Sequence, residues 1–191
     1  MFGILLRLRT HKVALIGDIK KMYNMIHTTP KEKHMRRVVW RFGKTGEAFK
    51  TFGIDVVMFG DAPAAAMSSI VVRETAEIYK DINEEAASVI QDDTYVDDIT
   101  TGRDEMSEVI SLREGITEIL DRGGLHVKGF VISGEASEEA ISLLGSGDVS
   151  RVLGVTWNPT KDVFSITVKI NISKKYIGAR KEPDLTFEEI P

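Results

Sequence analysis

The sequence predicts an α+β fold in which helices pack on one face of a small antiparallel sheet. Short apolar runs rich in branched residues, typical of strands, alternate along the chain with longer stretches of helical periodicity. Several of the strand-like runs are close enough in sequence to pair as hairpins, which favours antiparallel pairing. The chain has 191 residues, 42% of them apolar, and is therefore long enough to bury a core.

The first half of the chain is expected to begin with a buried strand that ends beside an acid. Four apolar residues, Val13 to Ile16, predict the strand, and Asp18 follows at its carboxyl end. Pro63 and the three alanines after it predict the start of the longest helix. The expected elements, in order, are a strand over 11–19, a helical turn over 20–26, a helix over 30–40, a strand or hairpin over 49–59, and a helix over 62–79 with helical character continuing to about residue 90.

The second half is expected to contain a hairpin with acids in its turn. The segment 94–100 alternates like a strand but carries Asp97 and Asp98 at its centre, which predicts a tight turn between two short strands. Gly123 and Gly124 predict the end of the helix before them. The other expected elements are a helix over 105–120, a strand over 126–133, a helix over 137–144, strands over 152–157 and 163–168, and a linker over 171–191.

Composition and charge exclude several classes of protein. The absence of cysteine excludes disulfides, zinc ribbons and thiol nucleophiles. No apolar run approaches the roughly 18 residues of a membrane span, and residues 1–10 lack a signal-peptide cleavage pattern. We therefore expect a protein that is not secreted and has no membrane partner. Residues 1–50 carry 12 basic and 3 acidic residues, whereas the remainder carries 13 and 26, so any basic face is expected in the first quarter.

Three acids form the strongest candidate for a chemical site. If the strand that carries Asp18 lies beside the predicted hairpin, Asp18, Asp97 and Asp98 meet at one end of the sheet. Like charges about 4 Å apart repel by roughly 4 kcal/mol at an effective dielectric near 20, so such a cluster calls for cations. Mg²⁺ binds carboxylate oxygens together with substrate phosphates, and a pair of such ions assists phosphoryl transfer. The alternative is a solvated turn, which is the interpretation given to Asp92 and Asp93.

Five segments in order along the chain resemble the motifs of reverse transcriptases. VALIGDIKKMY resembles motif A, FGDAPAAAMSS motif B, YVDD motif C and GGLHVKGFVISG motif D. RVLGVTWNP with KDVFSITVKI resembles the primer-grip hairpin and strand. By chance, the tetrapeptide YVDD is expected in about one chain in a thousand of this length. The motif sequences are similar to those of the polymerases of Pao-type (BEL) long-terminal-repeat retrotransposons, and the resemblance covers about residues 3 to 190.

The resemblance assigns the reaction centre to the three acids. Asp18 and Asp97 match the main ligands of two Mg²⁺ ions, with Mn²⁺ as a possible substitute, and Asp98 would support the site electrostatically or ligate in some states. The backbone carbonyl of Ile19 would join these ligands. Lys128 matches the motif D lysine, a candidate proton donor or charge partner to departing pyrophosphate. A plain surface lysine is the alternative for that residue.

Further matches concern the nucleotide, the primer and the template. Tyr23 matches the aromatic steric gate that would clash with a 2′-hydroxyl, with a core tyrosine as its alternative. Gly60, Ala62 and Pro63 match the start of motif B and would approach the incoming nucleotide. The primer and template contacts that the resemblance implies are Tyr95, Val96, Leu153, Gly154, Trp157, Arg36 and Arg37. An equal alternative for Trp157 is a role in core packing. For Arg36 and Arg37 the alternative is that they are exposed charges on a helix.

The function implied by the resemblance is RNA-directed DNA polymerase. The chain would form a right-hand polymerase palm over 1–170, with a fingers-like insertion at about 27–60, and 171–191 would be a linker toward a thumb and connection. Its partners would be an RNA or DNA template, a primer, deoxynucleotides and the rest of a Pol polyprotein with protease, ribonuclease H and integrase. Such a protein is expected inside the cell, in a cytoplasmic virus-like particle.

Two alternatives from other classes stay open. The chain could be a catalytically inactive remnant of a retrotransposon polymerase that at most binds nucleic acid. It could also be a small RNA-binding sandwich of the RRM type. That module needs surface aromatics on its central strands for base stacking, whereas the hairpin here presents acids.

Overall fold

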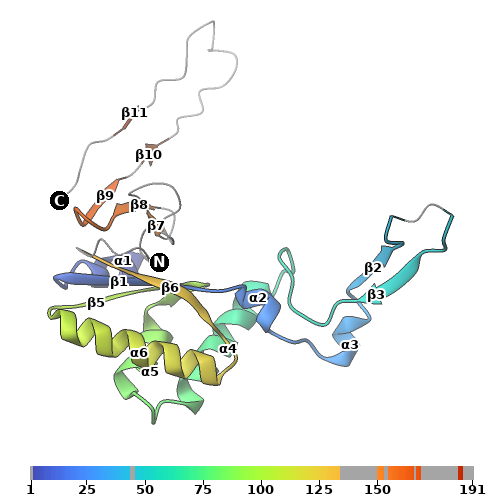
Figure 1. The fold of residues 1–191 in the computed structure, drawn as a ribbon, viewed down its shortest axis with the longest axis horizontal. Coiled ribbons are helices and arrows are strands. Elements are labelled where there is room, and N and C mark those ends of the chain that lie inside the picture. Colours follow the sequence, from blue (N-terminus) through green and yellow to red (C-terminus); the bar gives the residue numbers. More distant parts are fainter. Residues whose placement is uncertain are drawn as a thin grey trace, which may run out of the picture. The chain divides into compact units, whose positions relative to one another are not determined.

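The fold combines helices with an antiparallel sheet. The computed structural model describes residues 2–43, 46–133, 150–152, 155–165, 167–168 and 185–186. The strands of the largest sheet, in the order in which they pair, are β4 (Thr94–Tyr95), β5 (Asp98–Arg103), β1 (Val13–Ile19) and β6 (Val127–Ile132) (Figure 1). The predicted mixture of helices and an antiparallel sheet is therefore confirmed.

The chain divides into two compact units. The first comprises residues 1–18, 98–113 and 129–191, and the second comprises 19–97 and 114–128. The boundaries lie after Asp18 near the end of β1, before Asp98 at the start of β5, after Arg113, and after Lys128 in β6.

Strands β1 and β5 form the centre of the first unit. They pair antiparallel from Val13 opposite Arg103 to Asp18 opposite Asp98. The strand predicted over 11–19 is confirmed, and Leu15 in its middle has no exposed surface. Burial on both faces explains why the sequence here is a continuous apolar run rather than an alternating one.

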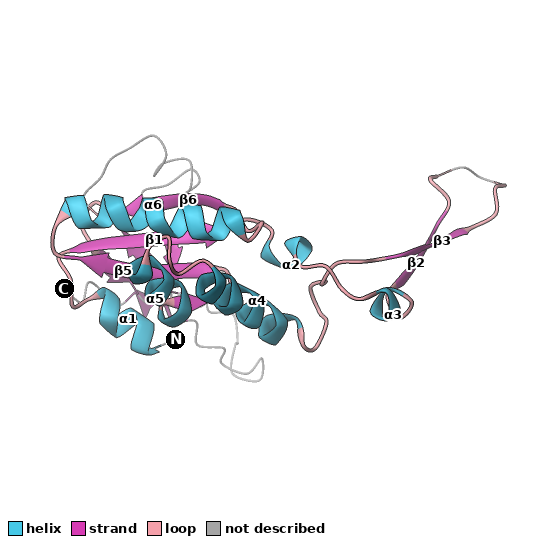
Figure 2. Ribbon diagram, turned by 90° about the horizontal axis from the view of Figure 1, so that it is seen from below, coloured by secondary structure: helices cyan, strands magenta, loops and turns pink. Residues whose placement is uncertain are grey.

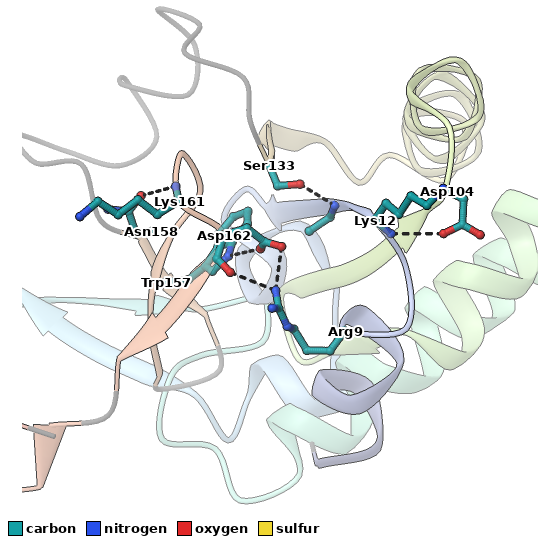
Figure 3. A network of polar contacts seen from close by, with 9 residues as sticks. Arg9, Lys12, Asp104, Ser133, Trp157, Asn158, Lys161 and Asp162 are labelled. Carbon is teal, nitrogen blue, oxygen red and sulfur yellow. Dashed lines mark hydrogen bonds and ion pairs between the residues drawn. The ribbon is translucent and has the colours of Figure 1, made fainter. Parts of the chain in front are cut away.

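A second group of contacts in the first unit joins the amino-terminal helix to a carboxyl-terminal hairpin. Helix α1 (Phe2–Leu8), which the sequence analysis did not predict, contacts β5. Its Leu8 packs with Ile16 and Trp157 in one buried cluster. Just after α1, Arg9 donates from Nη1 to Oδ2 of Asp162 at 2.7 Å, and the same carboxylate accepts from Trp157 Nε1 at 2.9 Å (Figure 3).

That hairpin belongs to a three-stranded sheet. Strands β7 (Ser150–Val152), β8 (Val155–Asn158) and β9 (Val163–Ser165) pair antiparallel in this order. In the turn between the last two strands, the Asn158 side chain accepts from the backbone N–H of Lys161 (Figure 3). Strands β10 (Thr167–Val168) and β11 (Leu185–Thr186) form a separate pair.

Helices make up most of the second unit. Helix α2 (Met22–Met25) follows β1 as predicted and contacts α4 (Ala64–Ile78), the predicted long helix. The continuation to about residue 90 is a separate helix, α5 (Glu84–Asp92), because Asn83 has extended backbone and caps it by accepting from the Ala86 N–H at 2.9 Å. Helix α6 (Met106–Arg122) lies close to the predicted range (Figure 2). It ends before Gly124, which has a φ of 74°.

The helix predicted over 30–40 is wrong beyond its first turn. Helix α3 (Pro30–Lys33) is followed by strand β2 (Arg37–Trp40), which pairs with β3 (Lys50–Gly53). The sequence RVVW at β2 consists largely of β-branched and aromatic residues, which favour strands. Strand β3, which follows nearby in the chain, provides the hydrogen-bonding partner. Both figures show β2 and β3, with α3 beside them, set apart from α4 (Figures 1 and 2). We call residues 29–53 the arm.

Two predictions remain to be placed. The helix expected over 137–144 lies outside the described residues, as does most of the linker expected over 171–191. Within the part of the chain that the structure describes, no helix has the length and apolar character needed to cross a membrane.

Candidate functional site

Two acids face each other across neighbouring strands of the first unit. Asp18 on β1 is the register partner of Asp98 on β5, and both residues are half-buried. In an antiparallel pair, the Cβ atoms of directly opposed residues lie about 4.5–5.5 Å apart. Two carboxylates that were a similar distance apart, about 5 Å, would repel by roughly 3 kcal/mol at an effective dielectric near 20. Such a pair is an arrangement that a bound cation stabilises.

The third acid lies in the turn before β5. The predicted hairpin is confirmed: Val96 and Asp97 connect β4 directly to β5. In the second unit, the Ile19 N–H donates to the Asp97 carbonyl at 2.8 Å, which fixes the backbone of the turn. Val96 has a φ of 58°. This conformation is uncommon for a β-branched residue, so the turn is strained at the residue before the two acids.

The opposed carboxylates suit a divalent cation that also binds substrate. Among the described residues, no group of three or more acids or histidines is placed to hold a metal ion. Mg²⁺, however, is usually bound by one or two protein carboxylates, with waters and substrate phosphates completing its shell. Asp18 and Asp98 supply two such carboxylates from facing positions. The pair therefore fits this mode of binding, and the three-acid set expected from the sequence stays a prediction.

The expected nucleotide-contacting residues lie on α2 and at the start of α4. Tyr23 is half-buried on α2, four residues after the end of β1. Gly60 has a φ of 93°, so the loop before α4 adopts a conformation that favours glycine. Ala62 is exposed, and exposed Pro63 is the residue that precedes the first turn of α4.

The basic candidates have different surroundings. Arg36 is largely buried, and its Nε donates to Asp61 Oδ2 at 2.8 Å. Arg37 is exposed on β2, with Nη2 at 3.1 Å from the His34 ring. Lys128 is exposed on β6, two residues after His126, whose carbonyl accepts from the Lys20 N–H. Exposed Arg37 and Lys128 are accessible to a phosphate, whereas the Arg36 side chain already pairs with the Asp61 carboxylate.

The expected primer contacts are only partly described. Tyr95 is 44% exposed at the end of β4, beside Val96 in the turn. Trp157 is fully buried, which favours the core-packing alternative for its ring. Leu153 and Gly154 lie outside the described residues.

Two residues in the second unit were missed by the sequence analysis. The Phe59 ring packs edge-to-face on Tyr23, with the centroids 4.8 Å apart, and Asp61 binds Arg36. The aromatic–glycine–acid sequence at 59–61 is a turn signal that could have indicated them. The four exposed aromatics of the arm were also missed, and for Trp40 the reason is that the helix expected over 30–40 hid the alternation of β2. These are Trp40, Phe42, Phe49 and Phe52.

Comparison with known proteins assigns no family. The chain matches no protein-family model and no curated protein. The molecule itself offers three features that bear on function. They are the opposed carboxylates of β1 and β5, the strained turn before β5, and the aromatic contact between α2 and the loop before α4.

Proposed function

We propose that the chain is the palm region, with part of the fingers, of an RNA-directed DNA polymerase. The observation that carries this proposal is the register of β1 and β5, which sets Asp18 directly opposite Asp98 at the strand ends. Asp97 precedes Asp98 in a two-residue turn whose backbone is held by Ile19. The motif order in the sequence, with an acid after the first strand and two acids in a hairpin turn, adds support.

The reaction is attack of a primer 3′-oxygen on the α-phosphorus of a deoxynucleotide. A new P–O bond forms, the bond to the β-phosphate oxygen breaks, pyrophosphate leaves, and the 3′-hydroxyl loses its proton. Bound Mg²⁺ would supply charge stabilisation for the attacking and leaving oxygens. Asp18 and Asp98 would hold it from facing strands, with Asp97 as the further ligand. Lys128, exposed on β6, would provide a proton or positive charge for the pyrophosphate.

Sugar selection would fall to Tyr23. Its half-buried ring is on α2, the first helix after the strand that carries Asp18. A rigid ring beneath the sugar leaves room for a C2′ methylene but not for a hydroxyl. Replacement of Tyr23 by alanine is therefore expected to raise incorporation of ribonucleotides relative to deoxynucleotides.

Primer extension by the purified chain tests the proposal. We expect the wild-type chain to extend a primer on an RNA template with Mg²⁺ or Mn²⁺, and Asp18→Asn or Asp97→Asn to lower the rate by orders of magnitude. The matched control is Asp92→Asn, which removes one carboxylate of the Asp92–Asp93 pair at the carboxyl end of α5. Circular dichroism checks that each variant is folded. Undiminished extension by either site variant would remove the mechanism.

A second candidate function is binding of nucleic acid without catalysis, and the arm favours it. Val38 and Trp40 lie on one face of β2, opposite Phe52 and Lys50 of β3. Phe42 packs edge-to-face on Phe52, with the ring centroids 5.7 Å apart. Exposed aromatics flanked by basic residues form stacking platforms for single strands.

Extension and binding measured together separate the two candidates. A chain that binds a single-stranded oligonucleotide but extends no primer with either metal ion would be the inactive remnant. A chain whose extension depends on Asp97 would be the polymerase. In both cases the arm would contact phosphates through residues such as Arg37, which position the strand without reading its sequence.

A further inference from the structure

An exposed phenylalanine is held against the expected sugar gate. Phe59 is 76% exposed, yet its ring packs on the half-buried ring of Tyr23 at 4.8 Å between centroids and 82° between planes. This edge-to-face geometry is the favourable one for aromatic pairs. Phe59 thus restricts the Tyr23 ring while presenting most of its own surface to an incoming molecule.

The loop that carries Phe59 is a closed turn. The Met58 N–H donates to Asp61 Oδ2 at 3.1 Å, and the Asp61 N–H donates back to the Met58 carbonyl at 3.3 Å. Gly60 between them has a φ of 93°, which lets the chain reverse within four residues. Phe59 therefore projects from the tip of a turn that is tied at both ends.

An ion pair connects this turn to the arm. Arg36 Nε donates to Asp61 Oδ2 at 2.8 Å, and the two side chains are only 14% and 23% exposed. The Arg36 carbonyl accepts from the Ile54 N–H at 2.8 Å, and the Asp61 carbonyl accepts from the Ala64 N–H as α4 begins. Asp61 is therefore anchored on both sides, which fixes the place of Phe59.

We propose that Phe59 is a specificity-determining residue that acts with Tyr23 to select deoxyribose, and that Arg36 and Asp61 position it. The inference rests on the proposed polymerase function. Two aromatic rings offer carbon surface to the C2′ side of a sugar. A ribose hydroxyl placed there would lose its hydrogen bonds to water and gain none, whereas a methylene would lose nothing.

Nucleotide binding gives a readout that does not depend on catalysis. Isothermal titration calorimetry with Mg²⁺ would measure the affinities of the wild-type chain for dGTP and GTP, and we expect tighter binding of dGTP. Phe59→Ala is expected to lower this preference by about threefold to tenfold, because one aromatic pair contributes a free energy that corresponds to that range. Phe59→Tyr, which keeps the ring, restores the preference. Ile78→Ala, which removes a large exposed side chain from the end of α4, leaves it unchanged.

A double variant distinguishes selection from simple structural support. If Phe59 acts through Tyr23, then adding Phe59→Ala to Tyr23→Ala changes the preference no further. Asp61→Asn should lower the preference by less than Phe59→Ala does. A wild-type chain without preference, or a Phe59→Ala chain that keeps it, would overturn the inference. If primer extension still depends on Asp97 in that case, the polymerase proposal stands and only the role of Phe59 falls.

Discussion

Two antiparallel strand pairs in this molecule have similar geometry but opposite surroundings. Four of the six β5 residues and five of the seven β1 residues are buried. All eight residues of β2 and β3 are exposed. The first pair is therefore held in register by a core, whereas the second depends on its own hydrogen bonds and on contacts along the ribbon.

The difference indicates what each pair is suited for. A one-residue slip of β1 would turn its apolar side chains out of the core, so the register that opposes Asp18 and Asp98 is strongly specified. The arm has no such restraint, and its apolar side chains are available to a partner. Rigid placement suits a site that must hold a small cation, and an exposed aromatic ribbon suits a long flexible strand.

The largest expected effect is on stability. Leu15→Ala removes a fully buried side chain from β1 and is expected to lower the free energy of unfolding by about 2–5 kcal/mol. Val39→Ala in β2, where the side chain is 58% exposed, is expected to change it by less than about 0.5 kcal/mol. Urea denaturation followed by circular dichroism measures both. Equal losses would show that the arm shares a core with the rest of the chain.

A smaller effect is expected on nucleic-acid binding. Trp40→Ala is expected to weaken binding of a single-stranded oligonucleotide by about 1–3 kcal/mol, since one stacking surface is lost. Val39→Ala, on the opposite face of the same strand, is the matched control and should bind as the wild type does. Fluorescence anisotropy at two salt concentrations measures the affinity and its electrostatic part. Identical affinities for the two variants would contradict the assignment of the aromatic face.

The smallest expected effect is a pH dependence confined to the arm. The Thr29 backbone N–H donates to Glu32 at 2.8 Å and holds the pKa of that carboxyl below its ordinary value of 4.5. The contribution to α3 is therefore complete above that value and is lost as the pH falls through the lowered pKa.

The amide resonance of Thr29 reports this contact in an NMR titration. We expect its chemical shift to move in acid in the wild-type chain and to stay constant in Glu32→Gln, which accepts a hydrogen bond but does not titrate there. A shift that is the same in both proteins would exclude Glu32 as the cause.

Much of the buried structure was predictable from sequence because burial leaves a pattern. The apolar run at 13–16, the Pro63 helix start and the turn at Val96–Asp97 each lie in an element close to the expected one. The sequence predicts that Asp18 meets the hairpin acids only if their strands are neighbours, and the register of β1 and β5 meets this condition for Asp18 and Asp98.

The arm was not predictable in the same way. Pro30 and the capping box of Thr29 and Glu32 are true helix signals, but they specify only one turn. Whether the residues after that turn continue as helix or pair with β3 depends on contacts with residues 10 to 16 positions further along the chain, from Trp40 opposite Lys50 to Arg37 opposite Gly53. The contact of Phe59 with Tyr23 is likewise a tertiary one that no local pattern specifies.

Binding of Mn²⁺, followed by electron paramagnetic resonance, tests the central claim most directly, because it asks whether the opposed carboxylates share a cation. The wild-type chain should bind the ion, Asp18→Asn and Asp98→Asn should each weaken binding by about 10–100-fold or more, and Asp92→Asn should not. Wild-type affinity for Mn²⁺ in both the Asp18→Asn and Asp98→Asn variants would contradict the account.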